Sequence, residues 1–365
     1  MVATLFLCGD VMTGRGVDQV LPHPGDPTLH EPWVRDAGRY VELAEAAHGM
    51  ITRPLEPAAV WGNALAELDA VRPAARIVNL ETAITRSDDW CRDKEIHYRM
   101  HPANVRCLTA ARIDVAAIAN NHVLDWGETG LVETLDTLEA AGIRATGAGR
   151  DHAAARRPAC VPLAGGGRVV VVACGSATSG MPQSWGATPT RPGVDLLPDL
   201  SPATARSVCE RITAVRQPGD IAVVSIHWGT NWGHGVAEPF VDFAHALVDG
   251  GIDIVHGHSS HHVRPIEVYR NRLILYGCGD FIDDYEGIEG YEAFRPDLAV
   301  MVFPTVDATD RLVDLRLVPL QMRRFQLARV RGDDVVWLAD TLTRTSGRFG
   351  CRAVVGCDDA ITLRW

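Results

Sequence analysis

The sequence lacks the features of a secreted, membrane-anchored or nucleic-acid-binding chain. Its N-terminal apolar stretch ends after about eight residues, without a basic region before it, whereas a membrane span needs ~20 apolar residues. Lys and Arg (35) are fewer than Asp and Glu (46), so the formal net charge is −11 and no basic field is left for a phosphate backbone. We therefore expect no signal peptide, no membrane anchor, no nucleic-acid partner and a cytoplasmic location.

A disulfide framework is also missing. The nine cysteines form no C-x-x-C pair and no regular spacing, and the chain of 365 residues is long enough to bury a substantial core without staples. Cys8 and Cys174 stand inside apolar runs, where a thiol packs as a small hydrophobic group. Internal repeats and low-complexity tracts are absent too. The composition indicates a globular protein in a reducing compartment.

Short apolar runs, each followed by polar, Gly-rich or His-rich residues, recur along the chain and predict buried strands. Between them lie stretches with Ala and Leu at spacings of three and four, which predict helices. The predicted strands are residues 4–8, 76–80, 115–119, 169–174, 221–226, 252–255 and 273–276, and the predicted helices include 60–68, 131–141, 203–215 and 239–249. This alternation predicts an α/β sandwich.

Residues 296–365 have a different pattern, which is rich in predicted strands. These strands are 297–306, 312–322, 335–340 and 360–365, with little helix between them. We expect this segment to complete the sheets of a core formed by residues 1–295, within one domain. Two insertions interrupt the core, at 19–59 and 176–200. Both are rich in Pro and should form neither regular helix nor strand, so each is expected to be a lid, a substrate-binding flap or a surface Ω-loop.

Side chains that can hold a metal or move a proton follow nearly every predicted strand. They are Asp10, Glu81, Asn121, His122, His227, His258 and His261. In an open α/β sheet the carboxyl ends of the strands meet at one crevice, so residues that are distant in sequence come together. A single His after a strand is more often structural than a ligand. Taken together, the seven residues predict a shared acid/base or divalent-metal site for Mn, Zn or Mg, or for Ca if oxygen ligands dominate.

Other residues near these motifs are candidates for binding substrate. Lys94 and Arg99 follow the Glu81 loop and could bind a substrate carboxylate, although a solvated strand face is an equal alternative. Trp126, Trp228 and Trp232 flank the motifs and could pack against an aromatic or peptidic substrate, although tryptophan more commonly packs in a core. Asp280, in the last motif, is a further candidate contact.

The motifs in combination resemble the CapA family, which is named for poly-γ-glutamate capsule synthesis. They are CGDVM from residue 8, NLET from 79, ANNHVLDWG from 119, IHWG from 226, GHSSH from 257 and YGCGDF from 276. The resemblance covers roughly residues 4 to 290. It implies a calcineurin-like, four-layer αββα sandwich with two mixed sheets, in which the seven residues above line a metal site.

Departures from the expected patterns bear on the chemistry. A dinuclear metallophosphoesterase has Asp-x-His on its first strand and Gly-Asp-x-x-Asp on its second, but this chain has Asp10-Val11-Met12 and Asn79-Leu80-Glu81. Asn231 and Asp280 stand where the family usually has Glu and Asn. Because two-metal hydrolysis needs both ions about 4 Å apart, the missing ligands argue for one metal or a weaker pair.

Some family members without an anchor resemble the metal-dependent epimerase of lasso-peptide biosynthesis. The resemblance implies an acid/base enzyme that acts on a peptide or small carboxylate-bearing substrate and inverts the Cα of the C-terminal residue of a ribosomal precursor. Inversion needs an acid and a base on opposite faces of the α-carbon. The candidate groups are His122 with Asp125, and His227 or His258 with Asp10, Asp280 or Asp283. A metal-dependent hydrolase of a phosphoester or of a γ-glutamyl or peptide amide bond, and an accessory protein of capsule-type polyglutamate biosynthesis, are the alternatives.

Overall fold

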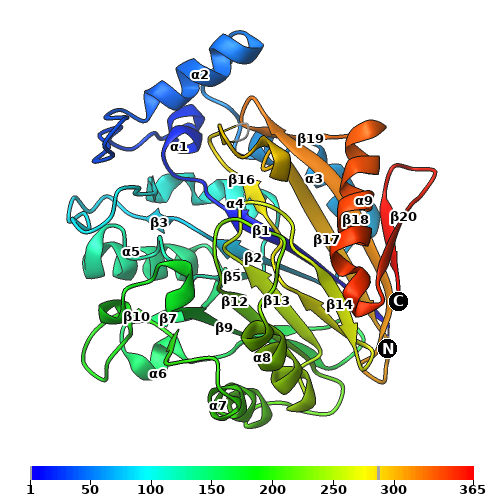
Figure 1. Ribbon diagram of the computed structural model, residues 1–365. Coiled ribbons are helices and arrows are strands. Elements are labelled where there is room, and N and C mark those ends of the chain that lie inside the picture. The colour runs from blue at the N-terminus through cyan, green and yellow to red at the C-terminus, as the bar shows by residue number, and fades with distance from the viewer. Residues whose placement is uncertain (1, 286–287) are drawn as a thin grey trace.

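Two sheets packed face to face form the centre of the computed structural model, which describes residues 2–285 and 288–365 (Figure 1). The first has the order β20 (Arg352–Val355), β21 (Ile361–Arg364), β18 (Leu312–Arg323), β17 (Leu298–Val306), β1 (Ala3–Val11), β2 (Ala75–Leu80), β5 (Val115–Ala117) and β6 (Arg144–Thr146), with β16 (Asp280–Ile282) on β1 and β19 (Gln326–Arg329) on β18. The sheet is mixed, because β1 pairs in parallel with β2 and antiparallel with β17.

The second sheet is also mixed. Its order is β11 (Leu196–Leu197), β9 (Arg168–Ser176), β12 (Ile221–His227), β13 (Ile254–His258), β15 (Arg272–Leu275) and β14 (Ile266–Tyr269), with β8 (Ala159–Pro162) on β9. Strands β9, β12 and β13 run in parallel, whereas β14 is antiparallel to β15. Two small ladders join β3 (Ala83–Ile84) to β4 (Arg99–Met100) and β7 (Ala148–Gly149) to β10 (Gly193–Val194).

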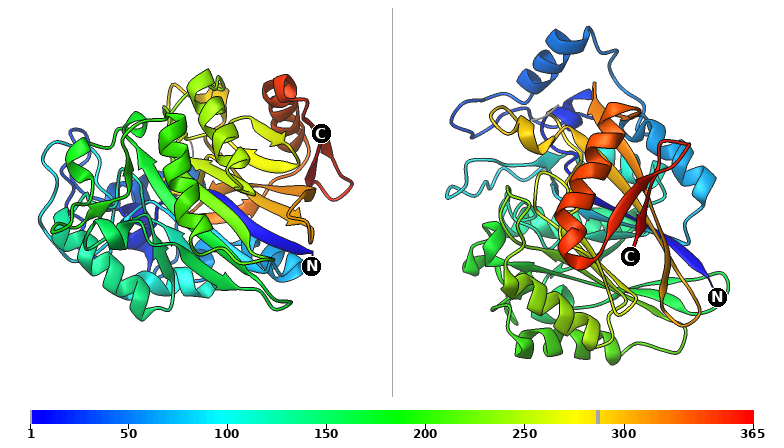
Figure 2. Two further views of the ribbon diagram at one scale, coloured as in Figure 1. Left: turned by 90° about the horizontal axis from the view of Figure 1, so that it is seen from below. Right: turned by 45° about the vertical axis from the view of Figure 1, so that its right-hand side comes forward.

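Alternate side chains of the strands build three layers of core. Leu5 and Leu7 of β1 point between the sheets and share a buried cluster with Val171 and Val223 of the second sheet. Phe6 points the other way, into a cluster shared with the helices on the outer face of the first sheet. The helices of that face are α3 (Asn63–Val71), α4 (Arg106–Ala110) and α5 (Gly127–Ala140), and those of the opposite face are α7 (Pro202–Thr213) and α8 (Glu238–Asp249). The expected four-layer αββα sandwich is thereby confirmed (Figures 1 and 2).

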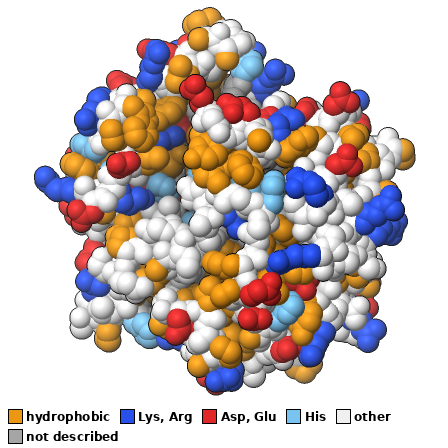
Figure 3. Space-filling model, in the orientation of Figure 1, with side chains coloured by type: hydrophobic (Ala, Val, Ile, Leu, Met, Phe, Trp, Pro, Cys, Tyr) orange, Lys and Arg blue, Asp and Glu red, His pale blue; other side chains and the backbone are white. Residues whose placement is uncertain are grey.

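The remaining helices are short or peripheral. They are α1 (Gly16–Val20), α2 (Gly38–His48), α6 (His152–Ala155) and α9 (Asp333–Ser346), with 3-10 turns η1 (Ala59–Trp61), η2 (Pro102–Val105), η3 (Ala177–Ser179), η4 (Gln183–Trp185), η5 (Glu292–Phe294) and η6 (Gly347–Phe349). None of the helices that the structure describes is both long enough and apolar enough to cross a bilayer. On the face shown in Figure 3, Lys and Arg side chains are interspersed with Asp and Glu.

All seven strands predicted for the core are present, as β1, β2, β5, β9, β12, β13 and β15. The predicted strand at 335–340 is wrong, because these residues belong to helix α9. Its buried residues Val335, Leu338, Ala339 and Leu342 follow the helical spacing of three and four, while Val336 is exposed. In a short window of sequence, the adjacent valines Val335 and Val336 look like part of a strand, because the helical spacing cannot be seen there.

The insertion at 19–59 is also more regular than predicted. It contains helix α2, which spans eleven residues at Gly38–His48, because the prolines of the insertion all lie outside those residues. After Ser176, the last residue of β9, the segment up to residue 200 contains only η3, η4 and the two-residue strands β10 and β11. Beyond residue 296, β17 pairs with β1 and β18 with β17, so the C-terminal segment widens the first sheet, with α9 beside its outer strands (Figure 2).

Candidate metal centre and its surroundings

The predicted site residues meet at the carboxyl ends of the parallel strands of both sheets. Asp10 lies at the end of β1, Glu81 follows β2, and Asn121 follows β5. His227 and His258 are the last residues of β12 and β13 and are direct partners in that ladder. The parallel register therefore brings residues that are distant in sequence to one place.

Asp10, His227 and His258 form the innermost group. Their ligand atoms all lie within 4.8 Å of one another, and each side chain is buried. Nδ1 of His227 is 2.8 Å from Nδ1 of His258. Burial lowers the pKa of both imidazoles well below the ordinary value, so both are neutral at pH 7. Two imidazole nitrogens and a carboxylate oxygen form a donor set that fits a borderline divalent cation such as Zn or Mn.

Asn121 determines which ring nitrogen of His227 carries the proton. Its Oδ1, which can only accept, is 3.0 Å from Nε2 of His227, so Nε2 donates. A neutral imidazole has one N–H, and Nδ1 of His227 therefore keeps a free lone pair that faces His258 and the carboxylates. This is the arrangement a ligating His needs, with the second ring nitrogen held by a hydrogen bond.

A carboxylate pair lies beside this group. The Nδ2 of Asn79 donates to Oδ1 of Asp10 at 2.8 Å and to Oε2 of Glu81 at 2.9 Å, so one amide holds both acids side by side. Burial and the neighbouring Asp280 raise the pKa of Asp10 to about 7, and burial and Asp10 raise the pKa of Glu81. Adjacent buried carboxylates resist ionising together, and a bound cation would remove that resistance.

His122 faces this pair from the loop after β5. Its Nδ1 bonds Oδ2 of Asp125 at 2.6 Å, and its Nε2 is 3.8 Å from Oε1 of Glu81. Burial lowers the pKa of His122 to about 4, although Asp125 opposes this shift. The pairing of His122 with Asp125 proposed from the sequence is therefore present, with one ring nitrogen directed into the site.

His261 forms a second histidine–carboxylate pair. Its Nδ1 is 3.0 Å from Oδ2 of Asp280, which also accepts from the hydroxyl of Tyr285 at 2.5 Å. Burial lowers the pKa of His261, but the Asp280 carboxylate outweighs burial and the net shift is upward. Asp280 is thus engaged with His261 and Tyr285 within the site.

Two predicted substrate contacts have other roles in the structure. Lys94 reaches the site, but its ammonium pairs with Asp125 at 2.5 Å and contacts the carbonyl of Asn121. Arg99 bonds Asp88 and the carbonyl of Ser87, and stacks 3.8 Å from the ring of Trp126. Because these partners already bind Lys94 and Arg99, neither side chain is free to bind a substrate carboxylate.

Trp228 is a core residue. Only 2% of its surface is exposed, its indole donates to the carbonyl of Tyr276, and its ring packs edge-on against Phe240 and Phe243. The interpretation of Trp228 as a substrate contact is therefore corrected. Trp232 lies nearer the candidate site, 5.2 Å from the ring of His261, and stacks on Tyr291.

Several residues of the site were not singled out from the sequence. Asn79 holds the two carboxylates, and Ser225 and His256 lie directly behind His258. Tyr98 donates its backbone N–H to Asp125 and sets its ring edge-on against His122. Asn79 could have been identified from the sequence, because it stands two residues before Glu81 and its side chain therefore lies on the same face of the strand.

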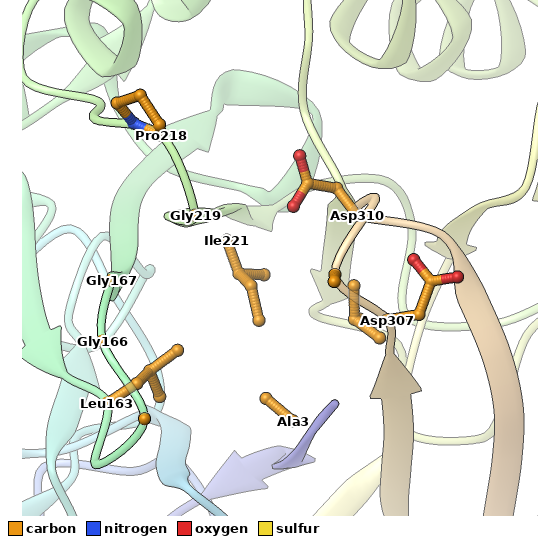
Figure 4. Close-up of a pocket in the computed structure, with 12 residues that line it drawn as sticks. Ala3, Leu163, Gly166, Gly167, Pro218, Gly219, Ile221, Asp307 and Asp310 are labelled. Carbon is orange, nitrogen blue, oxygen red and sulfur yellow. The ribbon is translucent and has the colours of Figure 1, made fainter. Parts of the chain in front are cut away.

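A separate cavity lies at the opposite end of the strands. It has a volume of about 340 Å³ and is lined by Ala3 and Ile221, the first residues of β1 and β12, together with Gly166, Gly219 and Asp307 (Figure 4). Its polar groups include no imidazole, so among the described residues the metal-binding chemistry gathers at the carboxyl ends of the strands instead.

Comparisons with known proteins identify the family of this chain. The family model described as bacterial capsule synthesis protein PGA_cap matches residues 4–285. The probable polyglutamine synthesis accessory protein of Mycobacterium tuberculosis (strain ATCC 25618 / H37Rv) is 49% identical over 364 residues, covering 99% of this chain and 96% of that protein. The PGA biosynthesis protein CapA of Bacillus subtilis (strain 168) is 27% identical over 335 residues, covering 92% and 75%.

Among solved structures, a 5'-nucleotidase precursor from Thermus thermophilus is similar with a TM-score of 0.49 and 14% identity, covering 95% of this chain and 59% of that one. The family match spans far more than half of the 365 residues and includes every candidate ligand from Asp10 to His261. The chain therefore belongs to the bacterial capsule synthesis protein family, PGA_cap.

Proposed function

We propose that this protein is a divalent-metal-dependent enzyme that serves as an accessory in the synthesis of a polyglutamate-type polymer, where it hydrolyses a γ-glutamyl or peptide amide bond. One observation carries the proposal: a buried donor group of Asp10, His227 and His258 lies beside an acid/base pair, His122 with Asp125. The polymer assignment is supported by the names of the relatives, which are a probable polyglutamine synthesis accessory protein and a PGA biosynthesis protein.

Asp10, His227 and His258 would hold the cation, with Glu81 and Asn121 next to them. A bound divalent cation supplies Lewis-acid polarisation of a carbonyl oxygen and lowers the pKa of water. His122 supplies proton transfer, because Asp125 holds Nδ1 and leaves Nε2 toward Glu81 and the site. Its lowered pKa keeps the imidazole neutral at pH 7, so His122 begins the reaction as a base.

The test uses short γ-linked and α-linked glutamate oligomers with the purified protein and added Mn²⁺ or Zn²⁺. New amino termini, detected by mass spectrometry, report cleavage. We expect cleavage that is abolished by EDTA and restored by excess metal, and that is lost in Asp10→Ala. His152→Ala, which removes an exposed histidine, is the matched control and should cleave normally. Cleavage that persists both in EDTA and in Asp10→Ala would rule out the metal-dependent reading.

A second candidate is epimerisation at the Cα of a peptide. It is favoured by the presence of two histidine–carboxylate pairs, His122 with Asp125 and His261 with Asp280, which arise from different loops. Two such pairs could supply the acid and the base that inversion needs. Incubation of a peptide substrate in deuterated water should then place one deuterium at the inverted carbon. Retention of configuration in every residue, alongside amide cleavage, would decide for the hydrolase.

A further inference from the structure

A line of hydrogen bonds runs behind His258, away from the proposed cation. Nε2 of His258 is 3.0 Å from Oγ of Ser225, and the same Oγ is 3.1 Å from Nδ1 of His256. Nε2 of His256 is 2.7 Å from the carbonyl oxygen of Cys8 on β1. Ser225 and His256 are direct partners in the β12–β13 ladder, and both are fully buried. The line therefore connects the two sheets through the interior.

The donor and the acceptor of each hydrogen bond can be assigned by starting from the end of the line at Cys8. The carbonyl of Cys8 can only accept, so Nε2 of His256 carries a proton. His256 is fully buried, with a carbonyl at Nε2 and a hydroxyl at Nδ1, and these two uncharged partners fit a neutral imidazole with a single N–H. Its Nδ1 must then accept the hydroxyl proton of Ser225. With its own proton committed, Ser225 accepts from Nε2 of His258, and Nδ1 of His258 is left without a proton.

This free nitrogen is the one that faces the site. It lies 2.8 Å from Nδ1 of His227, whose own proton sits on Nε2 toward Asn121. Both nitrogens therefore direct a lone pair into the group that includes the carboxylate of Asp10, where a cation could accept them. We propose that Ser225 and His256 are positioning residues that fix the tautomer of His258 and thereby set the metal affinity of the centre. This inference rests on the metal centre of the proposed function.

The experiment is a titration of chelator-treated protein with Mn²⁺ and with Zn²⁺ in a calorimeter. Outer partners of ligating histidines typically change metal affinity by about 10- to 100-fold, and we expect a loss of that size in Ser225→Ala and in His256→Phe. His256→Gln should retain the affinity, because its amide can donate to Cys8 and accept from Ser225 at once. Ser346→Ala removes another fully buried hydroxyl, bonded to the N–H of Ile266, and should leave the affinity unchanged.

Nitrogen NMR of histidine-labelled, metal-free protein gives a second readout that needs no metal. The signals of His258 are identified by their loss in His258→Gln. We expect Nε2 of His258 to be protonated in the natural protein and the two tautomers to mix in Ser225→Ala. A proton on Nδ1 of His258 in the natural protein would overturn the proposal.

The calorimetric outcomes distinguish the positioning role of Ser225 and His256 from the existence of the metal centre. If the natural protein binds metal and Ser225→Ala binds it equally well, the positioning role is wrong while the metal centre stands. If the natural protein binds neither cation, the metal centre is wrong, and the positioning role is rejected with it. Weakening in Ser225→Ala and His256→Phe, with retention in His256→Gln, supports both.

Discussion

At the scale of single residues, Lys94 acts on the proposed base, His122, through its charge. Its ammonium lies between Asp125, at 2.5 Å, and Nδ1 of His122, at 3.2 Å, and only 15% of its side chain is exposed. A positive charge at that position favours the ionised form of Asp125 and disfavours protonation of His122, which adds to the effect of burial. Lys94 thus helps His122 to remain an unprotonated base.

Removal of this charge should move the acidic limb of the pH profile. In Lys94→Met we expect the pKa of His122 to rise from its value of about 4, so that protonation stops activity at a higher pH than in the natural protein. Lys94→Arg keeps a cation and should leave the limb closer to its original position. The measurement is kcat/KM for oligomer cleavage between pH 4 and 8, and an unmoved limb in Lys94→Met would contradict this role.

The sequence was sufficient to predict which candidate ligands lie together, but not the residues that support them. Asp10, His227 and His258 could be identified because parallel strands deliver their carboxyl ends to one edge, and strand ends are visible as breaks in apolar runs. The sequence places Lys94 after the Glu81 loop as a substrate contact, but its pairing with Asp125 depends on the path of a loop with no regular pattern, and so could not be predicted. Trp228 was misjudged, because a motif places a residue in sequence without showing which face of the strand end it occupies.

At the scale of elements, Arg15 ties the insertion at 19–59 to the site. Its guanidinium bonds Asp284 and Glu31 and lies 4.2 and 4.4 Å from the rings of Tyr40, on α2, and Tyr98. Tyr98 in turn donates to Asp125. One buried cation, Arg15, therefore contacts α2 and the loop after β16 directly. Through Tyr98 it is also connected to the loop that carries Asp125, the partner of His122.

Breaking this connection should be costly. Arg15→Met would leave Asp284 and Glu31 without their cation in a buried place, and breaking a buried pair of this kind costs about 3–5 kcal/mol. Arg39→Ala, which removes an exposed pair with Glu42, is the control and should cost less than about 1 kcal/mol. The free energy of unfolding in urea decides, and equal losses in the two variants would refute the role of Arg15.

Strands could be predicted from the sequence where all of their residues are buried. Strands such as β12, whose seven residues are all buried, are short and mostly apolar, and their length and β-branched residues favour a strand over a helix. Helix α9 was missed because it lies at the border of the sandwich with one face exposed, and its paired valines imitate a strand. Helix α2 was missed because prolines before and after it suggested an irregular segment throughout.

At the scale of the whole molecule, buried neutral histidines make stability depend on pH. Burial lowers the pKa of His262 to about 3 and that of His256 to about 4, below the value of 6.5 for an exposed histidine. The unfolded chain therefore binds more protons below pH 6.5, and the folded state loses stability as the pH falls toward these values. Asp253, with its pKa raised to about 6, acts in the opposite sense as the pH rises through that value.

His262→Phe should flatten the acid side of the stability curve. Each buried histidine contributes a slope of about 1.4 kcal/mol per pH unit between its unfolded and folded pKa values. Phe keeps the packing against Trp232 and Phe294 and removes the titrating group. Urea unfolding at pH 7.5 and pH 5 gives the comparison, with His152→Asn as a surface control. An equally steep loss in His262→Phe would show that His262 does not contribute.

The pairing of β1 with β17 has a consequence for how the chain is made. Leu7 lies opposite Val302, so β1 leaves the ribosome long before β17, the strand that covers that side of it. Until then its backbone donors and acceptors form an open edge, which is the kind of surface that recruits strands from other chains. The strand that carries Asp10 therefore keeps one side uncovered until residues 298–306 have been made, which is later than every candidate ligand of the metal centre.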